Sequence, residues 1–308
     1  MKRVKIAVVG LGKIARDQHI PTLNSDDAFE LIAVASPHGK LDGVPSFSDI
    51  EAMLRATPDV EAVALCTTPQ VRYDIARFAL QQGRHVLLEK PPGVTVSEVL
   101  ALADVAKERR VTLFAGWHSR HARAVEAARV WLGWRKIFNV AITWKEDVRV
   151  WHPAQPWIWK AGGLGVFDPG INALSVLTGI IPGTFAMKSA ELSYPSNCET
   201  PIAARLLLTG PRGAMTQVEL DFLQTGPQTW DIDVETDAGR LSLSMGGNVM
   251  TVDNKPVATE PSTEYANLYA HFAELIRRGR ADVDIAPLQL VADAFLCGRR
   301  VDVEPFIE

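Results

Sequence analysis

One stretch of the sequence decides the fold: Val4-Lys5-Ile6-Ala7-Val8-Val9-Gly10-Leu11-Gly12-Lys13-Ile14-Ala15. Residues 4–9 are mostly apolar and β-branched, which is typical of a buried strand. Two glycines then permit a tight turn, and residues 13–24 suit a helix that Pro21 must end or kink. A strand, a turn and a helix in this order predict the start of a parallel β-α-β unit.

The same alternation continues as far as residue 115. Further strands are predicted over residues 31–35, 60–66, 85–88 and 111–115. The helices predicted between them begin at a capping box over Ser48–Glu51, run over residues 70–82, and begin at a second capping box over Thr95–Glu98. Strands that alternate regularly with helices form a parallel sheet covered on both faces. We therefore expect residues 1–119 to form a doubly wound α/β domain of the Rossmann type.

The pattern changes after residue 120. A helix near 121–132 is followed by longer strands of alternating character, and the chain closes with two helices. These strands are predicted over 137–145, 201–209, 214–222, 229–235 and 240–244, and the helices near 263–278 and 287–300. Short Gly/Pro/Asn turns between strands predict a mainly antiparallel, open sheet. Residues 120–308 are thus expected to form an α+β domain that binds the substrate and, through its open sheet face, a second copy of the chain.

Length, composition and charge agree with this division and exclude several classes of function. The chain has 308 residues, enough for two domains of about 150 residues each. Hydrophobic residues make up 47% and charged residues 22%, which is an ordinary globular composition. With 32 basic and 36 acidic residues, the net charge of -4 argues against a nucleic acid or an anionic membrane as the partner.

The sequence also argues against a membrane segment and a metal site. No apolar run approaches the roughly 18 to 20 residues of a membrane helix, and the N-terminal residues lack the features of a signal peptide. Cys66, Cys198 and Cys297 are widely spaced and form no CxxC pair, which excludes a disulfide scaffold and a zinc spacing. His118 and His121 are not completed by a carboxylate or a cysteine into a metal-binding set. We expect a soluble, cytoplasmic protein with no metal.

The glycine turn has the spacing of a dinucleotide site, GxGxx(G/A). The first glycine permits the turn, the second lets the backbone approach a pyrophosphate, and Ala15 allows the helix to pack closely on the strand. The alternative is a plain tight turn in an α/β domain. An acidic residue usually ends the second strand of a site selective for NAD, but here Ser36 and His38 stand in that loop. This loop predicts that NADP is tolerated and NAD is not excluded, although both residues could be simply solvated.

Further motifs carry a resemblance to a known family. Glu89-Lys90-Pro91-Pro92 follows the predicted strand 85–88, at the edge of the sheet where such folds bind ligands. The segment that begins Thr67-Thr68-Pro69 and the segment Gly162–Asn172 also match in order. Together with the glycine turn, these motifs resemble the glucose–fructose oxidoreductase / inositol dehydrogenase (Gfo/Idh/MocA) family over essentially the whole chain.

Within that family the chain looks closest to bacterial aldose 1-dehydrogenases that act on D-galactose or L-arabinose. This likeness is carried by Trp117-His118, Trp144-Lys145-Glu146-Asp147, Trp157-Ile158-Trp159 and Phe167-Asp168-Pro169-Gly170-Ile171-Asn172. There are departures from the wider family: Leu164 replaces the third small residue of a Gly-Gly-Gly run, and Tyr73 replaces a common histidine. The most important departure is Asn172, because the family usually has a catalytic histidine there and Asn cannot take a proton.

The resemblance implies NADP or NAD as cofactor and a set of residues that would contact it. These are Gly10, Gly12, Lys13, Ile14, Ser36, His38, Thr67, Thr68, Pro69, Glu89 and Lys90. It also implies that Lys90 and Asp168 are catalytic. Oxidation of a sugar at C1 needs a base for the hydroxyl proton and a donor for the C1 oxygen.

We assign these roles to Asp168 and Lys90 respectively, and expect the lysine charge to favour the ionised form of Asp168. Asn172 is added from its spacing, because two helical residues four positions apart share a face. The alternatives are a helix N-cap for Asp168, a surface lysine for Lys90 and a satisfied interior amide for Asn172.

A sugar site combines polar contacts with apolar stacking, and aromatic residues cluster between positions 144 and 159. The candidate substrate contacts are His118, Glu146, Trp151, His152 and Trp230. Core packing is the alternative for each tryptophan, since Trp is often mostly buried.

The sequence therefore predicts an NAD(P)-dependent aldose 1-dehydrogenase that forms an aldonolactone and assembles as a homo-oligomer, a dimer or a tetramer. Its rivals are a dehydrogenase of the same family that acts on a polyol such as inositol, and a dinucleotide- and sugar-binding regulator without turnover.

Overall fold

The computed structural model describes residues 2–307 and divides the chain into two units. The first unit contains the residues up to His118 together with Tyr265–Asp284, and the second contains Ser119–Glu264 together with the residues from Ile285 onward. Among the described residues, no helix combines the length and the apolar character that a membrane span requires.

The first unit is built on a six-stranded parallel sheet with the strand order β3-β2-β1-β4-β5-β6. The strands are β1 (Val4–Val9), β2 (Phe29–Ala35), β3 (Ser46–Phe47), β4 (Ala62–Leu65), β5 (His85–Glu89) and β6 (Leu113–Gly116). This is the order of a doubly wound Rossmann sheet, whose switch point lies between β1 and β4. The predicted fold class of this half is confirmed, and the glycine turn that follows β1 lies at the switch point.

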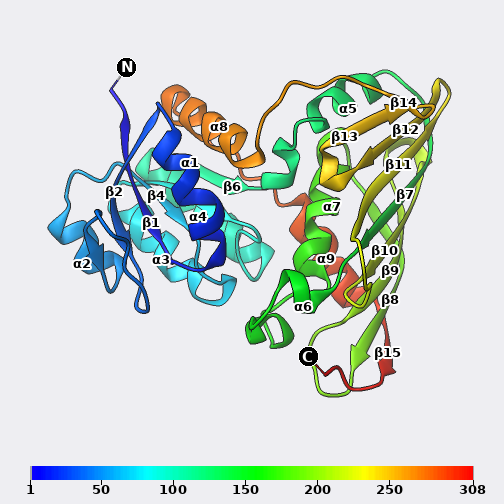
Figure 1. Cartoon of the computed structure of the whole chain (residues 1–308), viewed down its shortest axis with the longest axis horizontal. Helices are drawn as coiled ribbons and strands as arrows, with labels where there is room; N and C mark the ends of the chain where they lie inside the picture. The colour runs from blue at the N-terminus through cyan, green and yellow to red at the C-terminus, as the bar shows by residue number, and fades with distance from the viewer. Residues whose placement is uncertain (1, 308) are drawn as a thin grey trace. The chain divides into compact units, whose positions relative to one another are not determined.

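Helices cover both faces of this sheet (Figure 1). They are η1 (Ala15–His19), α1 (Ile20–Ser25), α2 (Ile50–Ala56), α3 (Pro69–Gln81), α4 (Val96–Arg109) and α8 (Glu264–Arg278). One apolar cluster joins one face of the sheet to η1, α1 and α8, and the other joins the opposite face to α2, α3 and α4. The capping box at Thr95 is present, with both of its hydrogen bonds. The one predicted at Ser48 is wrong, because Asp49 caps α2 by accepting the Ala52 N–H at 2.7 Å.

Helix α8 packs in the first unit, whereas the sequence predicts that residues 120–308 belong to the second domain. Tyr265, Leu268, Tyr269 and Phe272 lie on one stripe of the helix and are buried in the same cluster as strand β1. A helix with such a stripe must bury it against another element, and here that element is the parallel sheet. The chain therefore returns to the first unit before the last strand of the second sheet, residues 299–303, is added.

The second unit contains a nine-stranded sheet with the order β14-β13-β12-β11-β7-β10-β9-β8-β15. Its strands are β7 (Ile137–Lys145), β8 (Ala186–Pro195), β9 (Ala203–Thr209), β10 (Met215–Asp221), β11 (Thr229–Thr236), β12 (Gly239–Ser244), β13 (Val249–Val252), β14 (Lys255–Pro256) and β15 (Arg299–Val303). Most neighbours are antiparallel, but β7 pairs with β10 and β8 with β15 in parallel, so the sheet is mixed. The helix predicted over 287–300 ends at Cys297, and β15 follows it.

One face of this sheet carries α5 (Val125–Leu132), α7 (Phe167–Ile180) and α9 (Ala286–Cys297) (Figure 1). Short helical turns lie in the connections: η2 (His118–His121), α6 (Val148–Trp151), η3 (Pro156–Trp159), η4 (Pro211–Gly213) and η5 (Met245–Gly247).

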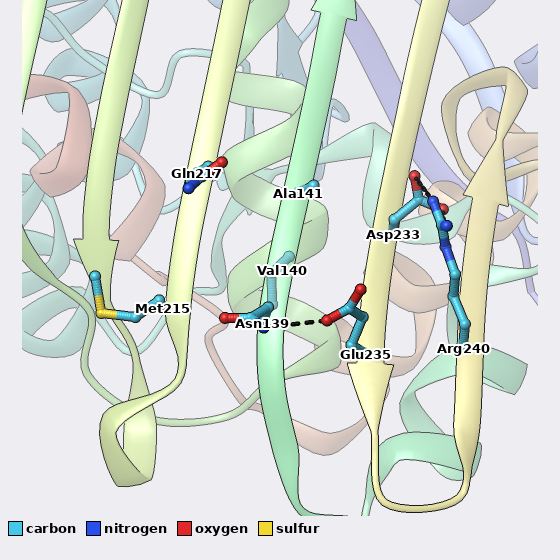
Figure 2. A pocket seen from close by; sticks show the side chains of 8 residues that line it. All are labelled: Asn139, Val140, Ala141, Met215, Gln217, Asp233, Glu235 and Arg240. Carbon is cyan, nitrogen blue, oxygen red and sulfur yellow. Dashed lines mark hydrogen bonds and ion pairs between the residues drawn. The ribbon is translucent and has the colours of Figure 1, made fainter.

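The other face of the sheet is exposed over its central strands, and Figure 2 shows the polar side chains that stand on it. Asn139 on β7 donates to Glu235 on β11 at 3.1 Å, and Arg240 on β12 pairs with Asp233 at 2.9 Å. These four side chains line a shallow depression of about 320 Å³, together with Met215 and Gln217 of β10.

Candidate active site

The glycine turn has the backbone geometry that a dinucleotide site needs. Gly10 has φ +94°, and a Cβ there would lie 2.8 Å from the Thr67 nitrogen at the end of β4. Only glycine fits where the turn passes so close to the neighbouring strand. A Cβ on Gly12 would meet nothing within 4 Å, so the turn is open on that side. Ala15 is fully buried where η1 begins, and the start of a helix after such a turn is where a pyrophosphate binds in dinucleotide sites.

The loops after β2 and β4 supply further candidate contacts with the cofactor. Ser36 follows β2 and donates its backbone N–H to the Phe47 carbonyl at 2.9 Å, and His38 is exposed two residues on. Thr68 and Pro69 begin α3, with Thr68 exposed as the N-cap. The buried Thr67 hydroxyl has no hydrogen-bond partner within residues 2–307. Such an orphaned polar group beside Gly10 fits a ligand that would complete its bonding.

Two residues of the predicted cofactor set turn out to have other partners as well. Lys13 pairs with Asp17 on the exposed side of the turn, and Ile14 packs against the apolar cluster beneath it. Sequence reasoning missed Arg16. The Arg16 guanidinium donates to the Lys40 carbonyl at 3.3 Å, in the loop that follows Ser36. Spacing from the glycine turn could not show that this side chain reaches the end of β2.

Lys90 follows β5 at the carboxyl edge of the parallel sheet and is half-buried. The preceding residue, Glu89, is 2% exposed, and its carboxylate accepts the Lys90 backbone N–H at 2.7 Å. The other oxygen of this carboxylate bonds to His19 Nε2 at 2.9 Å and accepts the Tyr265 hydroxyl at 2.6 Å. Burial would by itself raise the pKa of Glu89, but the hydrogen bond and the charge of His19 hold it well below its usual range.

His118 also belongs to the first unit. Its ring stacks on Tyr265 with the centroids 5.3 Å apart and an interplanar angle of 19°. His118 therefore lies against the group that bonds to Glu89, within the same unit as Lys90. The sequence offered no signal for this contact, because Tyr265 is far away along the chain.

The second unit gathers most of the predicted substrate and catalytic residues. Asp168 lies in the first turn of α7 and is 3% exposed. His152 stands between two carboxylates: its Nε2 is 2.9 Å from Glu146 Oε1, and its Nδ1 is 3.5 Å from Asp168 Oδ2. Trp230 donates its indole N–H to Glu146 Oε2 at 2.8 Å. Four residues from different segments of the second unit thus form one polar cluster.

The start of α7 explains how Asp168 is placed. The helix begins at Phe167 with Val166 as its N-cap, so the reading of Asp168 as an N-cap is wrong. Gly165 before it has φ +53°, and a Cβ there would collide with the Pro201 carbonyl. Asn172 lies one turn after Asp168 on α7 and is half-buried; no side-chain hydrogen bond of Asn172 is present among the described residues. An amide without a partner, on the same helix face as the carboxylate, is free to contact a substrate.

Aromatic rings form a wall beside this cluster. The Trp144 and Trp230 rings stack 5.9 Å apart, and Trp151 lies against Trp230 at 4.7 Å with a tilt of 59°. Trp151 is 40% exposed, whereas Trp144 is buried. Trp151 and Trp230 are therefore the two rings that can present a face to a sugar, while Trp144 belongs to the core. The side chain of Trp159 packs on Phe222 and takes no part in the wall.

The chain is similar to known oxidoreductases. A model of an oxidoreductase family, described as having an NAD-binding Rossmann fold, matches residues 4–117. A galactose 1-dehydrogenase of Pseudomonas fluorescens is 42% identical over 308 residues, which is all of both chains. The crystal structure of a D-galactose-1-dehydrogenase from Rhizobium etli has a TM-score of 0.96, with 51% identity over 100% of this chain and 99% of that one.

A more distant structure shows the fold alone. A 3-ketoreductase from Actinomadura kijaniata, solved with NADP, covers 98% of this chain with a TM-score of 0.84 at 18% identity. The family model and the full-length relative agree with the expected dinucleotide-binding domain and with the resemblance drawn from the motifs. The chain belongs to the Gfo/Idh/MocA family of oxidoreductases, whose dinucleotide domain is an NAD-binding Rossmann fold.

Proposed function

We propose that this enzyme is an NAD(P)-dependent aldose 1-dehydrogenase that oxidises a sugar such as D-galactose or L-arabinose to the aldonolactone. Two relatives named as galactose 1-dehydrogenases match the chain over its full length, at 42% and 51% identity. The observation that carries the proposal is the cluster of the second unit, in which the buried Asp168 lies beside His152, Glu146 and an aromatic wall. The polar groups and the aromatic wall suit a polyhydroxylated ring, and the carboxylate of Asp168 can accept a proton from it.

The proposed mechanism gives each predicted site residue a role. NADP or NAD, held at the glycine turn, would supply the acceptor for the hydride that leaves C1. The Asp168 carboxylate accepts the proton of the C1 hydroxyl, and the Lys90 ammonium donates a hydrogen bond to the C1 oxygen. The Asn172 amide holds the sugar one helical turn from the base. Glu146 and His152 bond to the other hydroxyls, while Trp151 and Trp230 pack on the C–H face of the ring; His118 is a further candidate contact.

The proposed cofactor is NADP or NAD, with NADP accepted because of the loop after β2. No carboxylate stands at Ser36, where an acidic residue would hold the ribose 2′-hydroxyl of NAD. Arg16 reaches this loop and bonds to the Lys40 carbonyl, and His38 is exposed in it. Cationic side chains at this position favour a 2′-phosphate.

The proposed assembly is a homo-oligomer, a dimer or a tetramer, formed through the exposed face of the nine-stranded sheet. Asn139, Glu235, Asp233 and Arg240 give that face both donors and acceptors for a second copy (Figure 2). Size-exclusion chromatography with light scattering tests this, and a monomeric mass would refute it. The cytoplasm is the proposed compartment, because all three cysteines are free thiols, as a reducing environment maintains.

Replacement of Asp168 by Asn tests the base. The amide keeps the size of the side chain but cannot accept the proton, so kcat should fall by about 100-fold or more. Binding of NADPH, followed by the fluorescence of its reduced nicotinamide, should be unchanged. An Asp168→Asn variant with the kcat of the wild type would refute the assignment. Cofactor binding by the wild type without turnover of any sugar would favour a regulator.

A further inference from the structure

The helix that follows the glycine turn ends in a fully buried histidine. His19 is the last residue of η1 and is 0% exposed. Both ring nitrogens are bonded: Nδ1 lies 2.7 Å from the Tyr269 hydroxyl and Nε2 lies 2.9 Å from Glu89 Oε1. The Tyr265 and Tyr269 rings stand edge-on to the imidazole, at 5.0 and 5.7 Å. The imidazole can therefore neither rotate nor reach water.

The carboxylate that His19 contacts holds the main chain of Lys90. Glu89 uses one oxygen for His19 and Tyr265, and the other for the Lys90 backbone N–H. On the other side of the same strand end, the buried Arg72 guanidinium donates to the carbonyls of Glu89 and Pro91. The backbone on both sides of Lys90 is therefore fixed, even though the Lys90 side chain is only half-buried.

A buried carboxylate stays in place only when its oxygens are satisfied, since an unpaired buried charge is very costly. Glu89 has three donors, and the cationic one is His19. Burial disfavours the charged form of His19, but Cys66, Tyr269 and Glu89 raise its pKa well above the ordinary value. The His19 imidazolium is thus the counter-charge that keeps Glu89 in the orientation that holds Lys90.

We propose that His19 is a positioning residue for Lys90, acting through the Glu89 carboxylate, and that it connects the placement of Lys90 to the helix of the glycine turn. The inference rests on the proposed function, in which Lys90 donates to the C1 oxygen of the sugar. Because η1 starts at the turn and ends at His19, a displacement of the turn is transmitted to the main chain of Lys90. A shift of about 1 Å at a catalytic group costs on the order of 100-fold in rate.

A double-mutant cycle on kcat tests this. His19→Gln keeps a donor for Glu89 but removes the charge, and Lys90→Ala removes the group that His19 is proposed to position. In the otherwise wild-type enzyme, His19→Gln should lower kcat by roughly 10- to 100-fold, with much smaller changes in the KM of the sugar and in NADP affinity. In the Lys90→Ala enzyme, the same substitution should have no further effect on kcat.

A matched control lies at the other end of the same strand. His85 begins β5, is half-buried and accepts the Thr112 backbone N–H at 2.9 Å. His85→Gln should leave kcat unchanged, whatever it does to stability. If His19→Gln does not fold, Tyr265→Phe takes its place in the cycle, because it removes one donor to Glu89 and keeps the ring.

The outcomes separate this inference from the proposed function. Equal losses of kcat in both backgrounds would overturn the positioning role, as would a lower melting temperature with kcat intact. If Lys90→Ala alone has the kcat of the wild type, the proposed role of Lys90 fails and the positioning role fails with it. A loss that depends on the presence of Lys90 supports the positioning role.

Discussion

Replacement of Glu89 by Gln should strongly destabilise the first unit. Gln has the shape of Glu, and its carbonyl oxygen can still accept from His19 and Tyr265. Its NH₂ group then faces the Lys90 backbone N–H, so that two donors meet and the bond of 2.7 Å is lost. Breaking a buried ion pair by removing one partner costs about 3–5 kcal/mol, and the pair of His19 and Glu89 is almost completely buried.

The stability that Glu89→Gln removes should depend on pH in a defined direction. The folded-state pKa of His19 lies well above 6.5, so its contribution is fully present below pH 6.5 and is lost as the pH rises through the raised pKa. The pKa of Glu89 lies well below 4.5, so its contribution is fully present above pH 4.5 and is lost as the pH falls toward the lowered pKa. The difference between wild type and variant should therefore be largest between pH 4.5 and 6.5.

Urea unfolding followed by circular dichroism, at about pH 5.5 and at strongly alkaline pH, measures this difference. Glu274→Gln is the matched control, because Glu274 is part of an exposed ion pair with Arg277 on α8 and its loss should have no measurable effect. A destabilisation by Glu89→Gln below about 1 kcal/mol, or one that is the same at both pH values, would refute the buried ion pair.

Three further substitutions probe the cofactor and sugar sites. Gly10→Ala should weaken NADPH binding by at least about tenfold, measured by the fluorescence of the reduced nicotinamide, because the turn must move away from Thr67; unchanged affinity would contradict this. Arg16→Gln should lower kcat/KM for NADP by roughly tenfold and for NAD much less, since a charged contact is lost; equal losses would exclude the 2′-phosphate. Trp230→Phe should raise the KM for galactose by about tenfold through the freed Glu146 oxygen, and an unchanged KM would place Glu146 outside the sugar site.

The parts of the fold that depend on local pattern could be predicted. The run from Val4 to Ala15 contains its own strand, turn and helix start, and the expectation of a doubly wound parallel sheet with a glycine turn after its first strand follows from it. The place of Lys90 at the carboxyl edge follows for the same reason. The strands β8 and β15 were missed, and their parallel pairing joins segments that are far apart in the sequence, with no short turn between them to indicate it.

The parts of the site that depend on distant contacts could not be predicted. Asp168 could be named from its motif, but its neighbour His152 is set by the turn after β7 and not by spacing. Arg16 and His19 were not predicted as site residues, because the sequence does not show which distant residue each side chain contacts. The reason that Glu89 needs His19 becomes visible only once α8 brings its two tyrosines into the first unit.

The most direct measurement is the appearance of reduced nicotinamide, followed by absorbance, when the purified enzyme is given NADP⁺ or NAD⁺ with a panel of sugars and polyols. Oxidation at C1 predicts turnover with D-galactose or L-arabinose and none with inositol, with an aldonolactone as the product. Turnover with inositol alone would place the reaction at another carbon. No turnover of any sugar, with NADP still bound, would contradict C1 oxidation by Asp168 and Lys90.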